Sequence, residues 1–382
     1  MTSRHSRFFV TPIEAGNTFQ RRYHYLDISP PAGVPQKATF LLLHGFPDCH
    51  ASWSRITAPL SMSGFRLIVP DCLGCGLSSK PAYPDRIAEY GLKSMVEDLC
   101  DLLDHARAGE GALYGAETIR LAGSGKGGRI VVIGHDWGGA LAWAFAQYHP
   151  ERLLGVSSLA VPYSAPSGKY ASIEEIIKRV PNFGYQQFFS SPRSTPIVEK
   201  HLERFLRLVF SAPGLFSSST SHNDPHAPIA NTEWVTVGKL ERQLTGGGDP
   251  PTTGGKLLSD EEFEGRMCVF RSGGMEGPLN WYRTTKINAE TEAGLISKGL
   301  PATLPALFLQ PDMDAALPTW MAKSGAKLVP SLRTVAVRNC GHWVQLECPS
   351  TTELEIRRWF DEKVVKQAEA LQGVVGWIKS KL

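Results

Sequence analysis

The sequence lacks the features that mark membrane, secreted and nucleic-acid-binding proteins. No apolar run among its 382 residues approaches the roughly 20 residues that cross a bilayer. The first residues, MTSRHSRFF, contain no apolar stretch of the kind found in a secretory signal. The formal net charge is only +3, which gives no reason to expect a nucleic acid or a membrane surface as partner. With 42% hydrophobic and 20% charged residues, the composition is typical of a soluble globular protein.

Cysteine is too sparse and scattered for a disulfide framework. The chain has seven cysteines, an odd number spread along the sequence, so we expect free thiols in a reducing compartment. Cys72 and Cys75 have C-x-x-C spacing, but a zinc site of that type needs a second pair, and the sequence has none at such spacing. We therefore expect no metal at these cysteines.

What the sequence does contain is a strand, a tight turn and a helix with a carboxylate at the turn. The apolar residues 130–133 predict a buried strand, GHDWGG follows, and ALAWAFAQY is typical of a buried helix. Small residues around one polar residue predict a nucleophile elbow, whose strained backbone raises that side chain above the strand end. Serine is usual at this position, but here it is Asp136. A carboxylate attacks an electrophilic carbon directly, which favours an epoxide or an alkyl halide over an ester as substrate.

The order of the apolar segments predicts an α/β fold. Strand-like segments alternate with helical patterns up to residue 163, which favours a mostly parallel sheet with helices on both faces. The segments expected to form strands are residues 22–28, 39–43, 66–70, 130–133, 153–161, 306–310 and 332–337. Ser172 with Glu175 and Ser350 with Glu353 have capping-box spacing, so we expect a helix to begin at each pair.

The strand pattern stops for about 140 residues and then resumes, which predicts an inserted domain. We expect a core formed by residues 1–163 and 301–382, interrupted by a mainly helical cap over residues 164–300. Polar, glycine-rich stretches within residues 109–128 and 211–260 predict long loops. Ligands of such sheets bind beyond the carboxyl ends of the strands, so the elbow and the cap should face one cavity.

Two further positions complete the expected catalytic group. His342 follows the last strand, where the chain order of an elbow nucleophile, an acid and a histidine places the histidine. Asp312 and Asp314 both follow the strand at residues 306–310, where the carboxylate that orients this histidine is expected. We favour Asp314, and Asp312 remains the alternative.

Together these motifs resemble the epoxide hydrolases of the α/β-hydrolase family. The matching segments are HGFPD (residues 44–48), GHDWGG (134–139), GHW (341–343), FGYQQFF (183–189) and NWYR (280–283). NWYR together with an aspartate elbow is specific, whereas either alone would be weak. The resemblance implies the α/β-hydrolase fold with a cap, and conversion of an epoxide to a vicinal diol without a metal or organic cofactor.

The resemblance also implies a role for each residue. Asp136 would open the epoxide while Tyr185 and Tyr282 hold its oxygen, giving a covalent ester. His342, oriented by Asp314, would then activate the water that hydrolyses the ester. The backbone N–H groups of Phe46 and Trp137 would form an oxyanion hole. The residues expected around the substrate are His44, Pro47, Trp281 and Trp343.

Two other functions are compatible with an aspartate elbow. The elbow also resembles that of haloalkane dehalogenases, but those enzymes usually have Asn where this chain has Phe46. Haloacid dehalogenases of this fold are similar too, but they have the motif H-D-R, and in this chain Trp137 follows the aspartate. Paired tyrosines also have no evident task in halide release. A non-catalytic ligand-binding protein of this fold would not need Asp136, His342 and an orienting aspartate together.

The chain ends in Ser380-Lys381-Leu382, the tripeptide that a peroxisomal import receptor recognises. We therefore expect residence in the peroxisome, with some protein in the cytosol. This location agrees with reduced cysteines, lipid epoxide substrates and a role in detoxification.

Overall fold

The computed structural model describes residues 3–13, 19–115, 128–212, 232–246, 257–295 and 299–370. The larger part of each expected loop, residues 116–127, 213–231 and 247–256, lies outside the described residues, and so does the terminal tripeptide at 380–382. Among the described residues, no helix combines the length and apolar character needed to cross a bilayer.

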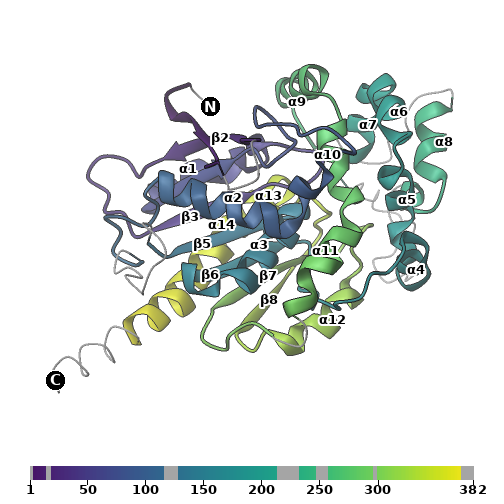
Figure 1. The fold of residues 1–382 in the computed structure, drawn as a ribbon. Coiled ribbons are helices and arrows are strands. Elements are labelled where there is room, and N and C mark those ends of the chain that lie inside the picture. Colours follow the sequence, from purple (N-terminus) through teal and green to yellow (C-terminus); the bar gives the residue numbers. More distant parts are fainter. Residues whose placement is uncertain are drawn as a thin grey trace, which may run out of the picture.

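An eight-stranded sheet occupies the centre of the core, in the order β1-β2-β4-β3-β5-β6-β7-β8 (Figure 1). The strands are β1 (Ser6–Val10), β2 (Arg22–Ile28), β3 (Ala38–Leu43), β4 (Phe65–Pro70), β5 (Ile130–His135), β6 (Leu153–Leu159), β7 (Ala306–Pro311) and β8 (Leu332–Val337). β1–β2 and β2–β4 are antiparallel, and every other pair is parallel. The predicted mostly parallel α/β fold is confirmed.

Helices cover both faces of the sheet, and the alternation along β3 shows how. Leu41 and Leu43 pack in one apolar cluster with α2 (Leu92–His105) and α3 (Trp137–Tyr148). Phe40 and Leu42 pack in the other, with α1 (Ser54–Met62) and α14 (Pro349–Trp359). Successive strand side chains point to opposite faces, so a continuous apolar run such as TFLLL fits a strand buried on both sides.

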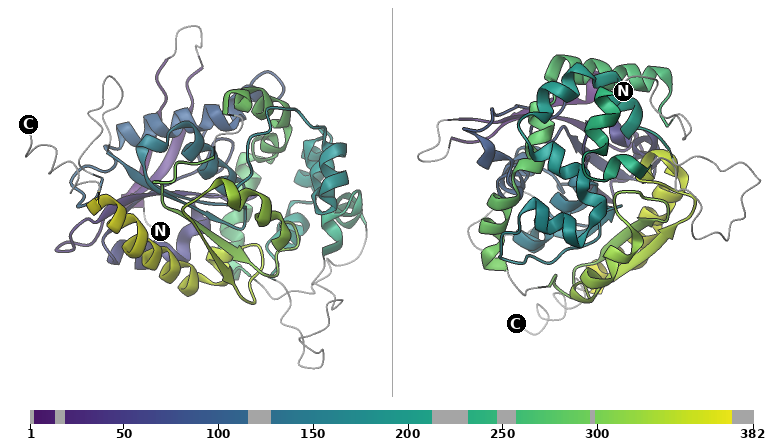
Figure 2. Two further views of the ribbon diagram at one scale, coloured as in Figure 1. Left: turned by 90° about the horizontal axis from the view of Figure 1, so that it is seen from below. Right: turned by 90° about the vertical axis from the view of Figure 1, so that its right-hand side faces the viewer.

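The described residues between β6 and β7 form helices and contain no strand. These helices are α4 (Ile173–Arg179), α5 (Gly184–Ser190), α6 (Ser194–Lys200), α7 (Leu202–Val209), α8 (Lys239–Thr245), α9 (Asp260–Gly273), α10 (Glu276–Asn280) and α11 (Thr285–Thr291). Figures 1 and 2 show them gathered at one end of the sheet. We keep the name cap for this group, and the predicted boundaries at residues 164 and 300 stay a prediction.

The remaining helical elements are short. They are α12 (Ala322–Gly325), α13 (Val344–Glu347), a π-helical turn (Phe360–Val365) and the 3-10 turns η1 (Ser3–His5), η2 (His50–Trp53), η3 (Ile87–Tyr90), η4 (Pro150–Arg152), η5 (Pro181–Phe183), η6 (Thr232–Val235), η7 (Trp281–Arg283), η8 (Glu292–Leu295), η9 (Thr319–Met321) and η10 (Ala326–Leu328).

One of the two predicted helix starts is confirmed and the other is wrong. Ser172 and Glu175 form both hydrogen bonds of a capping box at the start of α4. The second helix, α14, instead begins at Pro349, with Cys348 at the N-cap and no side-chain cap. Proline suits the first helical position because its fixed φ fits the helix and no amide hydrogen is wanted there. Ser350 therefore lies inside the first turn.

Candidate active site

The elbow forms as predicted between β5 and α3. Asp136 has φ 53° and ψ −125°, a strained conformation for a residue that carries a Cβ. Two glycines permit the close approach of the surrounding backbone. A Cβ on Gly134 would overlap the carbonyl of Gly138, and a Cβ on Gly138 would overlap the carbonyl of Leu43 in β3.

The Asp136 carboxylate is held between two groups from neighbouring strand ends. Its Oδ1 accepts a hydrogen bond of 2.8 Å from the backbone N–H of Phe46, which follows β3. Its Oδ2 lies 3.6 Å from Nε2 of His342, which follows β8. The Phe46–Pro47 bond is cis. One carboxylate oxygen is thus anchored by an amide, while the other faces an imidazole.

The structure brings Asp314, and not Asp312, to the histidine. His342 Nδ1 lies 2.8 Å from Oδ2 of Asp314. The other oxygen of Asp314 accepts the backbone N–H groups of Ala316 (2.8 Å) and Leu317 (3.1 Å), which fix the carboxylate in place. Asp312 instead lies 3.6 Å from Arg338.

The proximity of these charges shifts the pKa values of the group. Burial opposes ionisation of Asp136, but the hydrogen bond and charge of His342 outweigh it, so the pKa of this carboxyl is lowered. Burial likewise opposes a charge on His342, yet Asp314 and Asp136 raise its pKa well above the ordinary value. Asp136 is therefore ionised at neutral pH, as a carboxylate nucleophile requires.

Tyr185 of α5 and Tyr282 of η7 lie opposite Asp136, with ring centroids 6.1 Å apart. Tyr282 also packs edge-on against Phe46 (5.0 Å) and Trp137 (5.3 Å). Burial, reinforced by the Asp136 charge, raises the pKa of both hydroxyls, so both remain protonated donors at neutral pH.

A cavity of about 790 Å³, part of it open to solvent, joins these groups. The described residues that line it are Phe46, Pro47, Asp136, Tyr185, Phe189, Leu208, Val209, Ser211, Ala212, Trp234, Tyr282, Met313, Asp314, Ala315, Ala316, His342 and Trp343. The lining is mainly apolar, and it includes the carboxylate of Asp136, the imidazole of His342 and both phenols.

Two residues expected in the pocket lie outside this lining. His44 is fully buried, and its Nε2 accepts a hydrogen bond from the backbone N–H of Cys72. Trp281 is buried as well, and its indole N–H donates to the carbonyl of Leu73. Pro47 and Trp343 do line the cavity as expected. Of the four residues expected around the substrate, two therefore line the cavity and two are buried outside its lining.

Two residues that position His342 are not indicated by the sequence. Glu347 of α13 accepts the backbone N–H groups on either side of the histidine, those of Gly341 (2.7 Å) and Trp343 (2.8 Å). His135 Nε2 lies 2.8 Å from the carbonyl of His342. Burial, together with the neighbouring His342, lowers the pKa of His135 to about 3, so this ring is neutral and donates. Both contacts run through backbone atoms of the loop.

Comparison with known proteins identifies relatives over most of the chain. Residues 40–352 match the model of the alpha/beta hydrolase family. Epoxide hydrolase srdG of Neurospora crassa is 32% identical over 86% of this chain and 88% of its own length. Bifunctional epoxide hydrolase 2 of Rattus norvegicus is 28% identical over 90% of this chain, which spans only 54% of that longer protein.

The architecture is also shared with solved structures. Epoxide hydrolase A from Mycobacterium thermoresistibile superposes with a TM-score of 0.71 and 24% identity, covering 94% of this chain and 98% of that one. An epoxide hydrolase from Vigna radiata gives a TM-score of 0.68 and 19% identity over 95% of this chain and 100% of the other. These similarities concern the fold, which the two solved structures share over 94% and 95% of this chain.

Proposed function

The chain belongs to the epoxide hydrolases of the α/β-hydrolase family, and from this premise we propose a two-step mechanism for its hydrolysis of epoxides. In the first step, Oδ2 of Asp136 attacks an epoxide carbon from the side opposite the breaking C–O bond. Tyr185 and Tyr282 donate hydrogen bonds to the ring oxygen, and one of them protonates it as the ring opens. The product is a hydroxyalkyl ester on Asp136.

In the second step, water hydrolyses this ester. His342, oriented by Asp314, takes a proton from water, which attacks the Cγ of Asp136. The negative charge that develops on Oδ1 falls where the Phe46 N–H already points, at 2.8 Å. Trp137 opens α3, so its amide has no partner within the helix, and we assign it as the second oxyanion donor. The Cγ–Oδ2 bond then breaks, and the leaving oxygen takes the proton held by His342. The proton on the regenerated Asp136 carboxyl returns to the deprotonated tyrosine, and the vicinal diol is released.

The observation that carries this proposal is that both phenols share a cavity with the carboxylate. A dehalogenase has to stabilise a departing halide, for which two phenols with raised pKa values offer no proton-transfer advantage. An epoxide oxygen needs both a hydrogen bond and a proton as it leaves. The paired tyrosines therefore favour the epoxide over the alkyl halide.

Isotope labelling tests the covalent step. A single turnover in heavy-oxygen water, with enzyme in excess, should place label in the peptide that contains Asp136. The first diol should be largely unlabelled, because its new oxygen comes from the carboxylate and the solvent oxygen stays on the protein. Under substrate excess the later diol should carry label. Label in the diol alone during the first turnover would show that water attacks the epoxide directly.

We further propose an apolar, lipid-derived epoxide as substrate and the peroxisome as its location. The aromatic and aliphatic lining supports the first point, and Ser380-Lys381-Leu382 supports the second. A fluorescent fusion with a free C-terminus should colocalise with a peroxisomal marker, and deletion of the tripeptide should leave it in the cytosol. Diffuse signal from the intact chain would contradict the assignment.

A further inference from the structure

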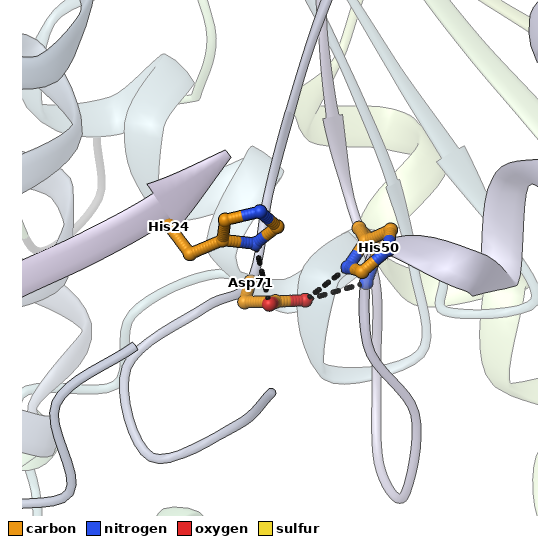
Figure 3. Close-up of side chains that lie close together, drawn as sticks. All are labelled: His24, His50 and Asp71. Atoms are coloured by element: carbon orange, nitrogen blue, oxygen red, sulfur yellow. Dashed lines mark hydrogen bonds and ion pairs between the residues drawn. The ribbon is translucent and has the colours of Figure 1, made fainter. Parts of the chain in front are cut away.

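A compact cluster of two histidines and one aspartate lies on the core, outside the catalytic group. It consists of His24 of β2, His50 at the start of η2, and Asp71 directly after β4 (Figure 3). Among the described residues, this is the cluster whose ligand atoms all lie within 4.8 Å of one another. The mechanism above uses none of the three.

Both imidazoles turn the same ring nitrogen toward one carboxylate. His24 Nδ1 lies 2.8 Å from Oδ2 of Asp71, and His50 Nδ1 lies 2.8 Å from Oδ1 (Figure 3). The side chains of His24 and Asp71 are 2% and 0% exposed, whereas that of His50 is 26% exposed. The cluster is therefore closed on the protein side and open to solvent along one edge.

We propose that His24, His50 and Asp71 form a binding site for a divalent transition-metal ion, with Zn²⁺ as the reference ion. Two imidazole nitrogens and a carboxylate suit zinc, cobalt, nickel or copper, whereas Mg²⁺ and Ca²⁺ prefer oxygen ligands alone. The ion takes the place of the protons that the two Nδ1 atoms share with Asp71. The open edge beside His50 leaves room for a water ligand.

Binding an ion changes the spacing of the three ligands. Zinc bonds of roughly 2.0–2.1 Å in a tetrahedron set neighbouring ligand atoms about 3.3 Å apart. The two nitrogen–oxygen contacts are 2.8 Å and involve different oxygens of Asp71, while the ligand atoms of the cluster lie within 4.8 Å of one another. The ligand atoms therefore have to move by up to about 1.5 Å relative to one another on that criterion. His50, whose side chain is 26% exposed, has more freedom to move than the buried His24.

The surroundings supply the supporting contacts of a metal site. Ser6 Oγ lies 2.8 Å from His24 Nε2, the ring nitrogen that faces away from Asp71. The backbone N–H groups of Leu77 (2.9 Å) and His50 (2.8 Å) donate to the two oxygens of Asp71. Each oxygen keeps a second lone pair for the metal. Such outer contacts commonly orient metal ligands and set the reactive ring nitrogen.

Titration calorimetry with Zn²⁺ on the chelator-treated full-length protein tests the site. We expect a binding event of one ion per chain that weakens at least tenfold in His50→Asn and in His24→Asn. Asparagine places an N–H where His Nδ1 stood, so it preserves the hydrogen bond to Asp71 but removes a strong ligand. Co²⁺ bound at the site should give a visible absorption band that these variants lose.

Two variants separate this site from other zinc binding. His149→Asn removes a partly exposed histidine that also faces two carboxylates, Glu97 at 3.2 Å and Glu151 at 3.1 Å, and should leave the affinity unchanged. Zinc held by the catalytic group would instead be lost in His342→Gln. Absence of stoichiometric binding to the unmodified protein overturns the proposal, as does binding that both cluster variants retain. In either case the cluster is only a hydrogen-bonded ion pair.

Discussion

The two walls of the active-site cavity differ in charge and in how they are built. The core wall presents Asp136, His342 and Asp314, which lie at strand ends and are linked by contacts of 2.8 and 3.6 Å. The cap wall presents Tyr185 and Tyr282, neutral phenols within a cluster of aromatic rings. The charged groups thus follow strands of the sheet, whereas the proton donors belong to helical segments of the cap.

This difference divides the reaction between the two walls. The core wall holds a permanent negative charge, because His342 lowers the pKa of Asp136 against the effect of burial. On the cap wall, burial and the same Asp136 charge raise the pKa of both tyrosines and keep them protonated. The nucleophile on one side therefore helps to preserve the acid on the other. Variants of each wall should affect different steps.

Replacing the base of the core wall should have the largest effect. In His342→Gln, ester formation continues but its hydrolysis loses the general base, so turnover should fall roughly 10³-fold. Mass spectrometry should then find protein carrying one intact substrate. His149→Gln is the matched control and should turn over normally. A slow His342 variant without any adduct would mean that the histidine acts before the ester forms.

Removing a donor from the cap wall should slow the other step. Tyr185→Phe or Tyr282→Phe should each reduce the rate of ester formation roughly 10²-fold, by analogy with loss of one positioned donor. Ester hydrolysis, measured by rapid quench, should hardly change. Tyr163→Phe removes a buried hydroxyl that bonds to Gln147 in the core and should leave both steps intact. Equal slowing of both steps would indicate that the tyrosines only shape the cavity.

The pH dependence should also separate the walls. Ester formation needs ionised Asp136, whose pKa is lowered, and protonated tyrosines, whose pKa values are raised, so its rate should be nearly flat from about pH 5 to 9. Ester hydrolysis needs neutral His342. Burial lowers the pKa of His342, whereas Asp314 and Asp136 raise it. Because esterification removes the charge of Asp136, the pKa of His342 should fall in the ester intermediate.

Below that intermediate pKa, the hydrolysis rate should drop about tenfold per pH unit, and the ester should accumulate in acid. Stopped-flow fluorescence of Trp137, beside the reacting carboxylate, can follow both phases. A parallel loss of both rates in acid would contradict the separation of roles.

The sequence predicted the core wall better than the cap wall, for physical reasons. The elbow and the Phe46 turn are short segments in which glycine and proline govern the local backbone, so the position of Asp136 could be read from neighbouring residues. Tyr185 and Tyr282 are about 100 residues apart in the printed sequence, and only the resemblance to a family linked them. Nothing local to either tyrosine indicates its partner.

Other features depend on details that a sequence does not contain. Asp312 and Asp314 follow the same strand, and the path of the loop after β7 decides which carboxylate meets His342. His44 and Trp281 belong to motifs near the cavity, but side-chain direction excludes them from its lining. Glu347 was missed because its partners are backbone amides, which every loop residue offers.

Glu347 allows the smallest and most selective test of the core wall. Its two oxygens hold the amides on either side of His342, so Glu347→Gln should leave one amide facing an NH₂ group and loosen the histidine. We expect ester hydrolysis to slow about tenfold, since a modest misplacement of a catalytic group costs that order of rate. Ester formation should be unchanged, because Asp136 and both tyrosines are untouched.

Glu353→Gln is the matched control, since Glu353 pairs with Arg357 on α14 and not with the histidine loop. Slower ester formation in the Glu347 variant would show that the loop also positions Asp136. Both steps of the reaction would then depend on this loop.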